Sequence, residues 1–378
     1  MKKYKVGIVG FGSIGKVHAY GYSTLPYYMD PAPLEGRITH VVCSRPETAE
    51  RARRLVGADV ASTDYRTVTE NPDIDIVHIC TPNHLHLAPL LSAMAAGKHI
   101  YCEKPIVDTL EEAEQVAAAL PSYKGVSQMV FHHRFFPSTI RAKQLIEEGA
   151  LGRILEFRGA YLHASHADPN LPMRWKASAA QGGGVIADLA SHWLDLCEDM
   201  IGPFGSLSAA THSPYPTRRD PADPTKQIAV DAEDSVSMMI RLADRGTLGS
   251  LQVTKLANGT ENEMTLEIYG TEGSLRFNGM DPHHVLFCDA TAPTKPSGGR
   301  FGWTEINTGH RYESPHTEFP ASKSNIGWVR GHTACLANFL AAVAKGEPTT
   351  PDLARGVEIQ RLIATIRNSA KSGTWVDV

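Results

Sequence analysis

The chain has 378 residues, of which 42% are hydrophobic and 21% charged, and its formal net charge is −4. This length suggests two domains, and the charge balance gives no basic surface for nucleic acid. No segment has the length and apolar character to span a bilayer, and the first apolar run, Val6 to Val9, is short for a signal peptide. Six scattered cysteines without a Cys-x-x-Cys pair favour buried free thiols in a reducing compartment. We therefore expect a cytoplasmic protein with neither a membrane nor a nucleic acid as partner.

The first 130 residues alternate short apolar runs with helical patterns. We expect strands at 6–9, 38–43, 76–80, 99–102 and 126–131, and helices at 13–25, 46–56, 85–96 and 109–120. Thr109 and Glu112 have the spacing of a capping box at the start of the last of these helices. The alternation predicts an α/β domain, residues 1–130, built on a doubly wound parallel sheet with right-handed crossovers.

After residue 130 the pattern changes, and β segments dominate. We expect helices at 137–148, 184–200, 331–344 and 351–371, strands at 154–161, 207–211, 235–242, 246–254, 264–269 and 273–277, and loops at 213–231 and 293–299. The run of alternating strands predicts an α+β domain, residues 131–378, with an open, mostly antiparallel sheet. The two closing helices are candidates for packing back on the first domain.

A glycine-rich turn, Gly10-Phe11-Gly12-Ser13-Ile14-Gly15, follows the first strand and opens the first helix. Gly10 permits the tight turn, Gly12 lets the backbone approach a pyrophosphate, and Gly15 allows close packing of the helix on the sheet. The alternative is a glycine-rich turn without a ligand. Because strand, turn and helix occur together, we expect dinucleotide binding, with Gly10, Gly12, Ser13 and Ile14 at the phosphates.

The end of the second strand bears on the choice of cofactor. An acidic residue there would accept a hydrogen bond from the ribose 2′-hydroxyl of NAD, but the chain carries Ser44 and Arg45 instead. A hydroxyl beside a guanidinium suits a 2′-phosphate, which favours NADP over NAD. The alternative is that Arg45 is an ordinary solvated loop charge.

Three residues suggest hydride transfer from an alcohol: Lys104 after a buried strand, and Asp188 and His192 after a run of three glycines. Residues four apart share one helix face, so Asp188 can hold the His192 imidazole in one tautomer while the other ring nitrogen accepts the hydroxyl proton. Lys104 can stabilise the developing alkoxide. We favour His192 as the proton acceptor, and a desolvated Lys104 is the alternative.

A plainer explanation of Asp188 and His192 is a hydrogen bond on a helix surface. Apolar neighbours favour a buried helix, with Trp193 in the core and with Asp195 and Asp199 on its wetter side. The paired histidines of the chain lack the spacing of metal motifs, so we expect no catalytic metal.

Taken together, the motifs resemble those of the glucose-fructose oxidoreductase, inositol dehydrogenase and rhizopine-catabolism (Gfo/Idh/MocA) oxidoreductases. The resemblance covers nearly the whole chain and rests on Gly10 to Gly15, Asp73-Ile-Asp-Ile-Val-His-Ile-Cys-Thr-Pro-Asn-His-Leu-His86, Ala96-Gly-Lys-His-Ile-Tyr-Cys-Glu-Lys-Pro105, Arg134-Phe-Phe-Pro137, the turn with Asp188 and His192, and Ile268 to Leu275. It implies an N-terminal Rossmann domain and a C-terminal domain whose sheet face often forms a dimer or tetramer interface.

The resemblance also implies residue roles. Thr81, Pro82, Asn83 and His86 would line the cofactor, Glu103 and Lys104 would lie at its nicotinamide end, and Lys104, Asp188 and His192 would face the substrate. His132 and Arg134 are candidate substrate contacts, at a position where this chain has His132-His133-Arg134 and departs from the Asn-x-Arg of many members.

Further candidate sugar contacts lie on segments expected to edge the cleft. They are Tyr161, His163, Arg174 and Trp175. Aromatic faces and planar donors suit a sugar ring, and the alternative is ordinary packing at a domain interface. The segment from Asp168 to Trp175 resembles that of members acting on sugars.

The sequence therefore predicts an NAD(P)-dependent dehydrogenase acting on a ring hydroxyl of a monosaccharide, anhydrosugar or inositol, as a homodimer or homotetramer. One alternative is a glycoside-processing enzyme that keeps and recycles its NAD(H). Another is a non-enzymatic dinucleotide sensor, which would have no use for Lys104, Asp188 and His192.

Overall fold

The computed structural model describes residues 3–29, 31–244, 246–308 and 327–378. Their contacts divide the chain into two compact units. Within the described residues, the first unit contains 3–132 and 329–361, and the second contains 133–308, 327–328 and 362–378. None of the described helices combines the length and the apolar composition that a membrane span requires.

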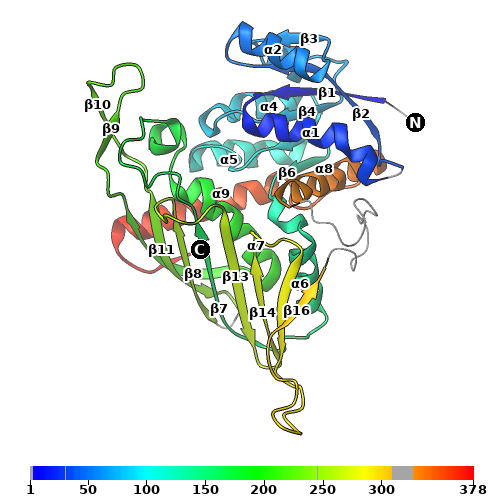
Figure 1. Ribbon diagram of the computed structural model, residues 1–378. Coiled ribbons are helices and arrows are strands. Elements are labelled where there is room, and N and C mark those ends of the chain that lie inside the picture. Colours follow the sequence, from blue (N-terminus) through cyan, green and yellow to red (C-terminus); the bar gives the residue numbers. More distant parts are fainter. Residues whose placement is uncertain (1–2, 30, 245, 309–326) are drawn as a thin grey trace. The chain divides into compact units, whose positions relative to one another are not determined.

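The first unit is built on a six-stranded parallel sheet in the order β3-β2-β1-β4-β5-β6 (Figure 1). Its strands are β1 (Lys3–Val9), β2 (Glu35–Val42), β3 (Val60–Ser62), β4 (Ile76–Ile79), β5 (His99–Cys102) and β6 (Ser127–Met129). The order reverses between β1 and β4, which makes the carboxyl ends of these strands the place where such a sheet binds its ligand. The predicted doubly wound fold is confirmed.

The helices of the first unit are α1 (Ser13–Tyr28), α2 (Pro46–Val56), α3 (Arg66–Thr69), α4 (Leu87–Ala95), α5 (Leu110–Ala119) and α8 (Trp328–Lys345). The expected capping box of α5 is present, since the Thr109 hydroxyl accepts from the Glu112 N–H and the Glu112 side chain accepts in return. Helix α8 packs closely on α1, because a Cβ on Gly21 would lie 2.7 Å from Leu336. The last helix, α9 (Leu353–Ser372), contributes residues to both units.

The second unit is built on a nine-stranded sheet in the order β16-β15-β14-β13-β7-β12-β11-β8-β17. Its strands are β7 (Ile154–Leu162), β8 (Phe204–His212), β11 (Ser235–Leu242), β12 (Leu248–Thr254), β13 (Glu263–Gly270), β14 (Gly273–Asn278), β15 (His284–Asp289), β16 (Thr304–Asn307) and β17 (Val376–Asp377). Only the β7–β12 pair within this sheet is parallel. Burial alternates along β11, so one face of the sheet is covered and the other exposed.

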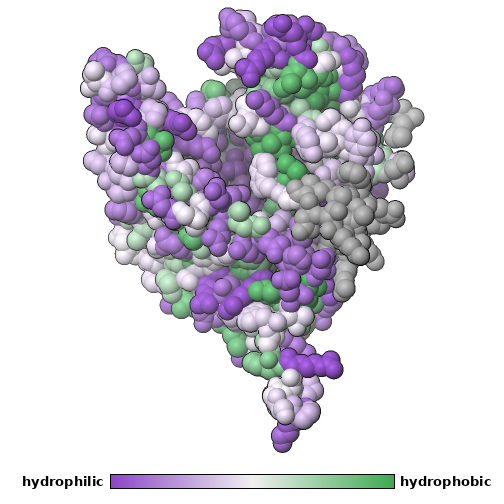
Figure 2. Space-filling view, in the orientation of Figure 1, coloured by the Kyte–Doolittle hydropathy of each residue, from purple (hydrophilic) through white to green (hydrophobic). Residues whose placement is uncertain are grey.

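The covered face packs against α6 (Pro137–Glu147) and α7 (Ser191–Ile201). Trp193 of α7 is fully buried, as expected, and its indole N–H donates to the Thr265 carbonyl oxygen at 2.9 Å. Gly159 of β7 lies under this ring, where a Cβ would come within 2.1 Å of it. Figure 2 shows mainly hydrophilic side chains on the visible surface, with apolar residues in small patches.

Besides the unpredicted strands β15, β16 and β17, two segments of this unit differ from the sequence-based expectation. The expected helix 184–200 begins as a π-helix, Ile186–Ala190, and continues as α7. The expected loop 213–231 contains a small hairpin, β9 (Thr217–Arg219) with β10 (Gln227–Ala229). Both hairpin strands are three residues long and mostly exposed, so they carry no hydrophobic alternation that the sequence could reveal.

Candidate active site

The phosphate turn of the first unit has the backbone geometry that its glycines predict. Gly10 has φ +90°, and a Cβ there would lie 2.6 Å from the Cys80 carbonyl group. A Cβ on Gly15 would lie 2.5 Å from the Gly10 carbonyl oxygen. Both positions therefore require glycine for the fold itself.

Gly12 is different, because a Cβ on this residue would meet no atom within 4 Å. It is the N-cap of α1, where no side chain caps the helix and no acidic residue occupies the first turn. Free space and uncapped N–H groups at a helix N-terminus suit a pyrophosphate. The turn therefore fits a dinucleotide, with Gly10, Gly12, Ser13 and Ile14 as its predicted contacts.

Ser44 and Arg45 lie just beyond the end of β2 and are exposed. Arg45 is the N-cap residue of α2, and Pro46 occupies the first helical position. Arg45 therefore follows the end of the strand that neighbours β1. Their role at a ribose 2′-phosphate stays a prediction.

His86 joins the turns that follow β4 and β5. Its Nε2 lies 2.8 Å from the Thr81 carbonyl oxygen, and its Nδ1 lies 3.0 Å from the Pro105 carbonyl oxygen. The ring is fully buried, and burial lowers the pKa of His86. A neutral ring of this kind holds the segment of Thr81, Pro82 and Asn83 against the Glu103-Lys104-Pro105 segment, both of which we expect at the cofactor.

A buried chain of hydrogen bonds reaches Glu103 from the partly exposed Tyr22. The Tyr22 hydroxyl lies 2.9 Å from His78 Nε2, His78 Nδ1 lies 3.0 Å from His18 Nδ1, and His18 Nε2 lies 3.0 Å from Glu103 Oε1. If Glu103 is a carboxylate and both rings are neutral, a single choice of tautomers forms all three hydrogen bonds. In it Tyr22 donates to His78, His78 donates to His18, and His18 donates to Glu103. The Lys104 backbone N–H donates to the other oxygen of Glu103 at 3.3 Å. The chain therefore fixes the carboxylate beside the predicted catalytic lysine.

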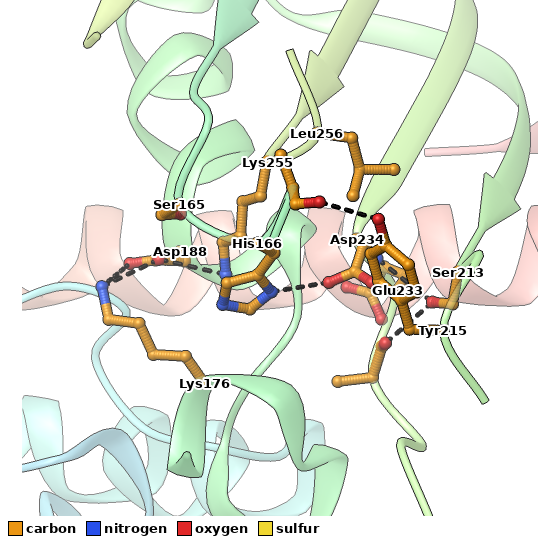
Figure 3. Close-up of polar contacts among 12 residues, drawn as sticks. Ser165, His166, Lys176, Asp188, Ser213, Tyr215, Glu233, Asp234, Lys255 and Leu256 are labelled. Carbon is orange, nitrogen blue, oxygen red and sulfur yellow. Dashed lines mark hydrogen bonds and ion pairs between the residues drawn. The ribbon is translucent and has the colours of Figure 1, made fainter. Parts of the chain in front are cut away.

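In the second unit, Asp188 forms ion pairs with two lysines (Figure 3). Lys176 Nζ lies 3.0 and 2.9 Å from the two carboxylate oxygens, and Lys255 Nζ lies 3.2 Å from one of them. The sequence reasoning assigned this carboxylate to His192 and named neither lysine. It also assumed a continuous α-helix, whereas Asp188 lies on the π-helical turn and His192 on α7.

His192 lies in an aromatic group of the second unit. Its ring packs edge-on against His133, with centroids 4.7 Å apart, and His133 packs edge-on against Tyr161 at 5.8 Å. Burial and then the charge of Asp188 raise the pKa of Tyr161, whose hydroxyl donates to Asn262. The charge of Asp188 therefore acts on Tyr161, and the His133 ring packs between the rings of Tyr161 and His192.

Arg134 makes internal ion pairs that the sequence did not suggest. Its guanidinium donates to both oxygens of Asp195, with Nε at 2.6 Å, and also to Asp199. Asp195 is fully buried and Asp199 is only 16% exposed, so the expectation that both lie on a wet side was wrong. The guanidinium supplies the counter-charge that permits their burial. A substrate contact by Arg134 stays a prediction.

The other candidate sugar contacts are His132 in the first unit and His163, Arg174 and Trp175 in the second. His132 stacks on His332 in the first unit, with ring centroids 3.8 Å apart. Trp175 is partly exposed, with Lys176 Nζ 5.6 Å from its ring centroid. Arg174 is exposed, while burial lowers the pKa of His163 and the charge of Asp188 opposes that shift. Their contact with a sugar stays a prediction, and so does the expectation that no metal is needed.

Comparison with known proteins gives consistent results along the chain. Residues 4–132 match the model of the oxidoreductase family with an NAD-binding Rossmann fold, and residues 139–276 match the GFO/IDH/MocA C-terminal domain. Levoglucosan dehydrogenase of Pseudarthrobacter phenanthrenivorans is 34% identical, over 100% of this chain and 99% of that protein. D-xylose dehydrogenase of Paenarthrobacter nicotinovorans is 32% identical over 56% of each chain.

Solved structures show the same similarity over the whole chain. The complex of levoglucosan dehydrogenase with NADH and levoglucosan superposes with a TM-score of 0.94 at 34% identity, covering 100% of this chain and 99% of that one. An oxidoreductase domain protein from Kribbella flavida superposes with a TM-score of 0.91 at 27% identity, covering 100% of both chains. The chain therefore belongs to the Gfo/Idh/MocA oxidoreductase family, as its motifs indicate.

Proposed function

We propose that this protein is an NAD(P)-dependent dehydrogenase that transfers a hydride between the nicotinamide and a ring hydroxyl or ketone of a monosaccharide, anhydrosugar or inositol. The observation that carries the proposal is the likeness to levoglucosan dehydrogenase over the whole of both chains. Family membership makes the chain an oxidoreductase acting on CH–OH groups. The sugar itself is the proposed part.

Each proposed catalytic residue has one task in the reaction. The bound nicotinamide supplies the hydride acceptor. Lys104 stabilises the alkoxide that develops on the sugar oxygen, and His192 accepts the hydroxyl proton. Asp188 supplies a negative charge that favours the imidazolium formed by this step. Its two lysine partners hold that carboxylate in place.

We propose NADP as the preferred cofactor, supported by Ser44 and Arg45 at the end of β2. The relatives differ on this point: a levoglucosan dehydrogenase was solved with NADH, and a scyllo-inositol 2-dehydrogenase of Bacillus subtilis is named for NADP+. Arg45→Ala should weaken NADP+ binding about tenfold while leaving NAD+ binding unchanged. Equal loss for both cofactors, or loss for neither, would refute the 2′-phosphate role.

The test of the function is turnover of a panel of anhydrosugars, monosaccharides and inositols with each cofactor, with levoglucosan tried first. Lys104→Ala should abolish turnover, and His192→Ala should lower kcat by about a hundredfold or more. Circular dichroism and cofactor binding should remain those of the wild type. Full activity of Lys104→Ala would reject the assignment.

We also propose that the protein is a cytoplasmic homodimer or homotetramer. Light scattering of the purified protein measures the mass of the assembly and so distinguishes the two.

A further inference from the structure

A fully buried lysine, Lys255, follows β12 in the second unit. Its side chain is 1% exposed. The backbone is fixed on both sides, because its N–H donates to the Asp234 carbonyl oxygen at 2.9 Å and its carbonyl oxygen accepts from the His166 N–H at 2.9 Å. A lysine is buried in this way only when something compensates its charge.

The compensation is Asp188, seen beside Lys255 in Figure 3. Within the described part of the chain, it is the carboxylate within ion-pair distance of this ammonium, at 3.2 Å. Burial lowers the pKa of Lys255, and the charge of Asp188 opposes that shift. The two groups therefore stabilise each other's charged forms.

The two lysines on Asp188 are not equivalent. Lys176 is 43% exposed, so water and salt screen its attraction for the carboxylate. Lys255 is screened by neither, and its attraction is correspondingly stronger. The Lys255 ammonium is itself buried from solvent, so it cannot touch a sugar and must act through Asp188.

We propose that Lys255 is a positioning residue of the reaction, which keeps Asp188 ionised and oriented for the proton transfer at His192. The inference rests on the proposed function, and it adds a residue that neither the motifs nor the relatives' names suggest. Charged and titratable groups that also act on Lys255 come from other elements: Lys176 beside Asp188, Glu233 before β11, and His163 after β7. The His166–Asp234 pair lies next to them, with 2.6 Å between Nδ1 and the carboxylate.

A purely stabilising role is the competing explanation. A buried ion pair is weak evidence for stability, because a hydrophobic residue of similar volume often stabilises the fold as well. Lys255→Met keeps most of the length of the side chain and removes the charge. It leaves Asp188 with the exposed Lys176, so the carboxylate should hold a proton to higher pH.

The experiment compares Lys255→Met with the wild type by two readouts. The first is the titration of the Asp188 carboxyl, followed by ¹³C NMR and assigned with Asp188→Asn. We expect its midpoint to rise by about one pH unit or more in Lys255→Met, because an opposite charge at this distance shifts a carboxyl by that amount. The second is the pH profile of kcat. We expect the acid limb of this profile to move to higher pH by about the same amount, so that kcat falls at acid pH and recovers as the pH is raised, with KM changed little.

Two matched controls separate this role from a structural one. Lys176→Met removes the exposed partner and should move the Asp188 midpoint much less than Lys255→Met does. Lys98→Met removes a lysine of the first unit that is 8% exposed and whose Nζ donates to the Asn71 and Ile74 carbonyl oxygens. It should lower stability and leave the pH profile of kcat unchanged.

An unchanged Asp188 midpoint in Lys255→Met would overturn the inference, as would a kcat loss that is the same at every pH. The titration needs no substrate. If the wild type turned over no sugar, the proposed function would fail, while the NMR titration would still decide whether Lys255 sets the charge of Asp188.

Discussion

Gly12→Ala should separate cofactor binding from folding, because the free space at Gly12 is the feature that most directly marks a ligand site in the phosphate turn. A Cβ at this position meets no protein atom within 4 Å, so the folded chain accommodates it without a clash. Alanine is a poorer N-cap than glycine, but it also reduces the entropy of the unfolded chain. These effects oppose each other, and we expect the free energy of unfolding to change by less than about 1 kcal/mol.

Cofactor affinity should respond differently. The backbone at Gly12 approaches the pyrophosphate closely in a fingerprint of this kind, so an added methyl group would take the space of the phosphate. We expect the Kd for the preferred cofactor to rise at least about tenfold, which corresponds to about 1.4 kcal/mol of binding free energy. Calorimetric titration with NAD+ and NADP+ measures it, and denaturant unfolding measures stability on the same preparation.

Gly15→Ala is the matched control. Its Cβ would lie 2.5 Å from the Gly10 carbonyl oxygen, so the backbone itself must move, and we expect a loss of about 2 kcal/mol or more of stability. Normal cofactor affinity in a folded Gly12→Ala would show that the dinucleotide does not bind at this turn. Unfolding of Gly12→Ala would show that its space is not free.

Two further predictions concern stability. Asp195→Asn weakens the buried ion pair with Arg134 and should lower the free energy of unfolding by at least about 2 kcal/mol. Glu148→Gln removes a charge from the exposed pair with Arg141 and should lower it by less than about 1 kcal/mol. Equal losses for the two variants in chemical unfolding would contradict a structural role of the Arg134–Asp195 pair. Burial lowers the pKa of His78 well below its usual value, so this histidine is neutral in the folded protein and takes up a proton mainly when the chain unfolds. The contribution of the neutral His78 to the free energy of unfolding is complete above about pH 6.5 and is lost as the pH falls further. Below that pH, the free energy of unfolding of His78→Gln should therefore decrease less steeply with falling pH than that of the wild type. The same pH dependence in both proteins would contradict a neutral, buried His78.

Local sequence signals predicted much of the first unit. Helix α2 was predicted with its observed bounds, because Pro46 marks its first turn and Gly57 ends it with φ +66°. The capping box of α5 was equally readable. The strands β3, β16 and β17 were missed because two to four residues carry too little alternation to be recognised. The six-residue strand β15 was missed because its buried and exposed positions do not alternate.

The polar partners within the site were not readable, because they come from distant parts of the chain. Lys255 and Asp188 are separated by 67 positions, and no local pattern links a lysine after a strand to a carboxylate on a π-helical turn. No local pattern links Arg134 to Asp195 either, and their ion pair explains why Asp195 is buried where the sequence reasoning expected it on the wetter side of the helix. A lysine directly after the buried end of β12 was the available signal for Lys255, and it is a weak one.

The most direct test of the central claim is the stoichiometry of oxidation by the wild-type protein. Purified protein, first stripped of any bound nucleotide, is mixed with a limiting amount of levoglucosan or another panel sugar and an excess of free NADP+ or NAD+. The reduced cofactor and the oxidised sugar are then counted. We predict one reduced cofactor released for each sugar oxidised. Conversion of a sugar without net cofactor reduction would contradict the dehydrogenase assignment and favour a recycled, tightly held NAD(H), and failure to bind either cofactor would contradict the account as a whole.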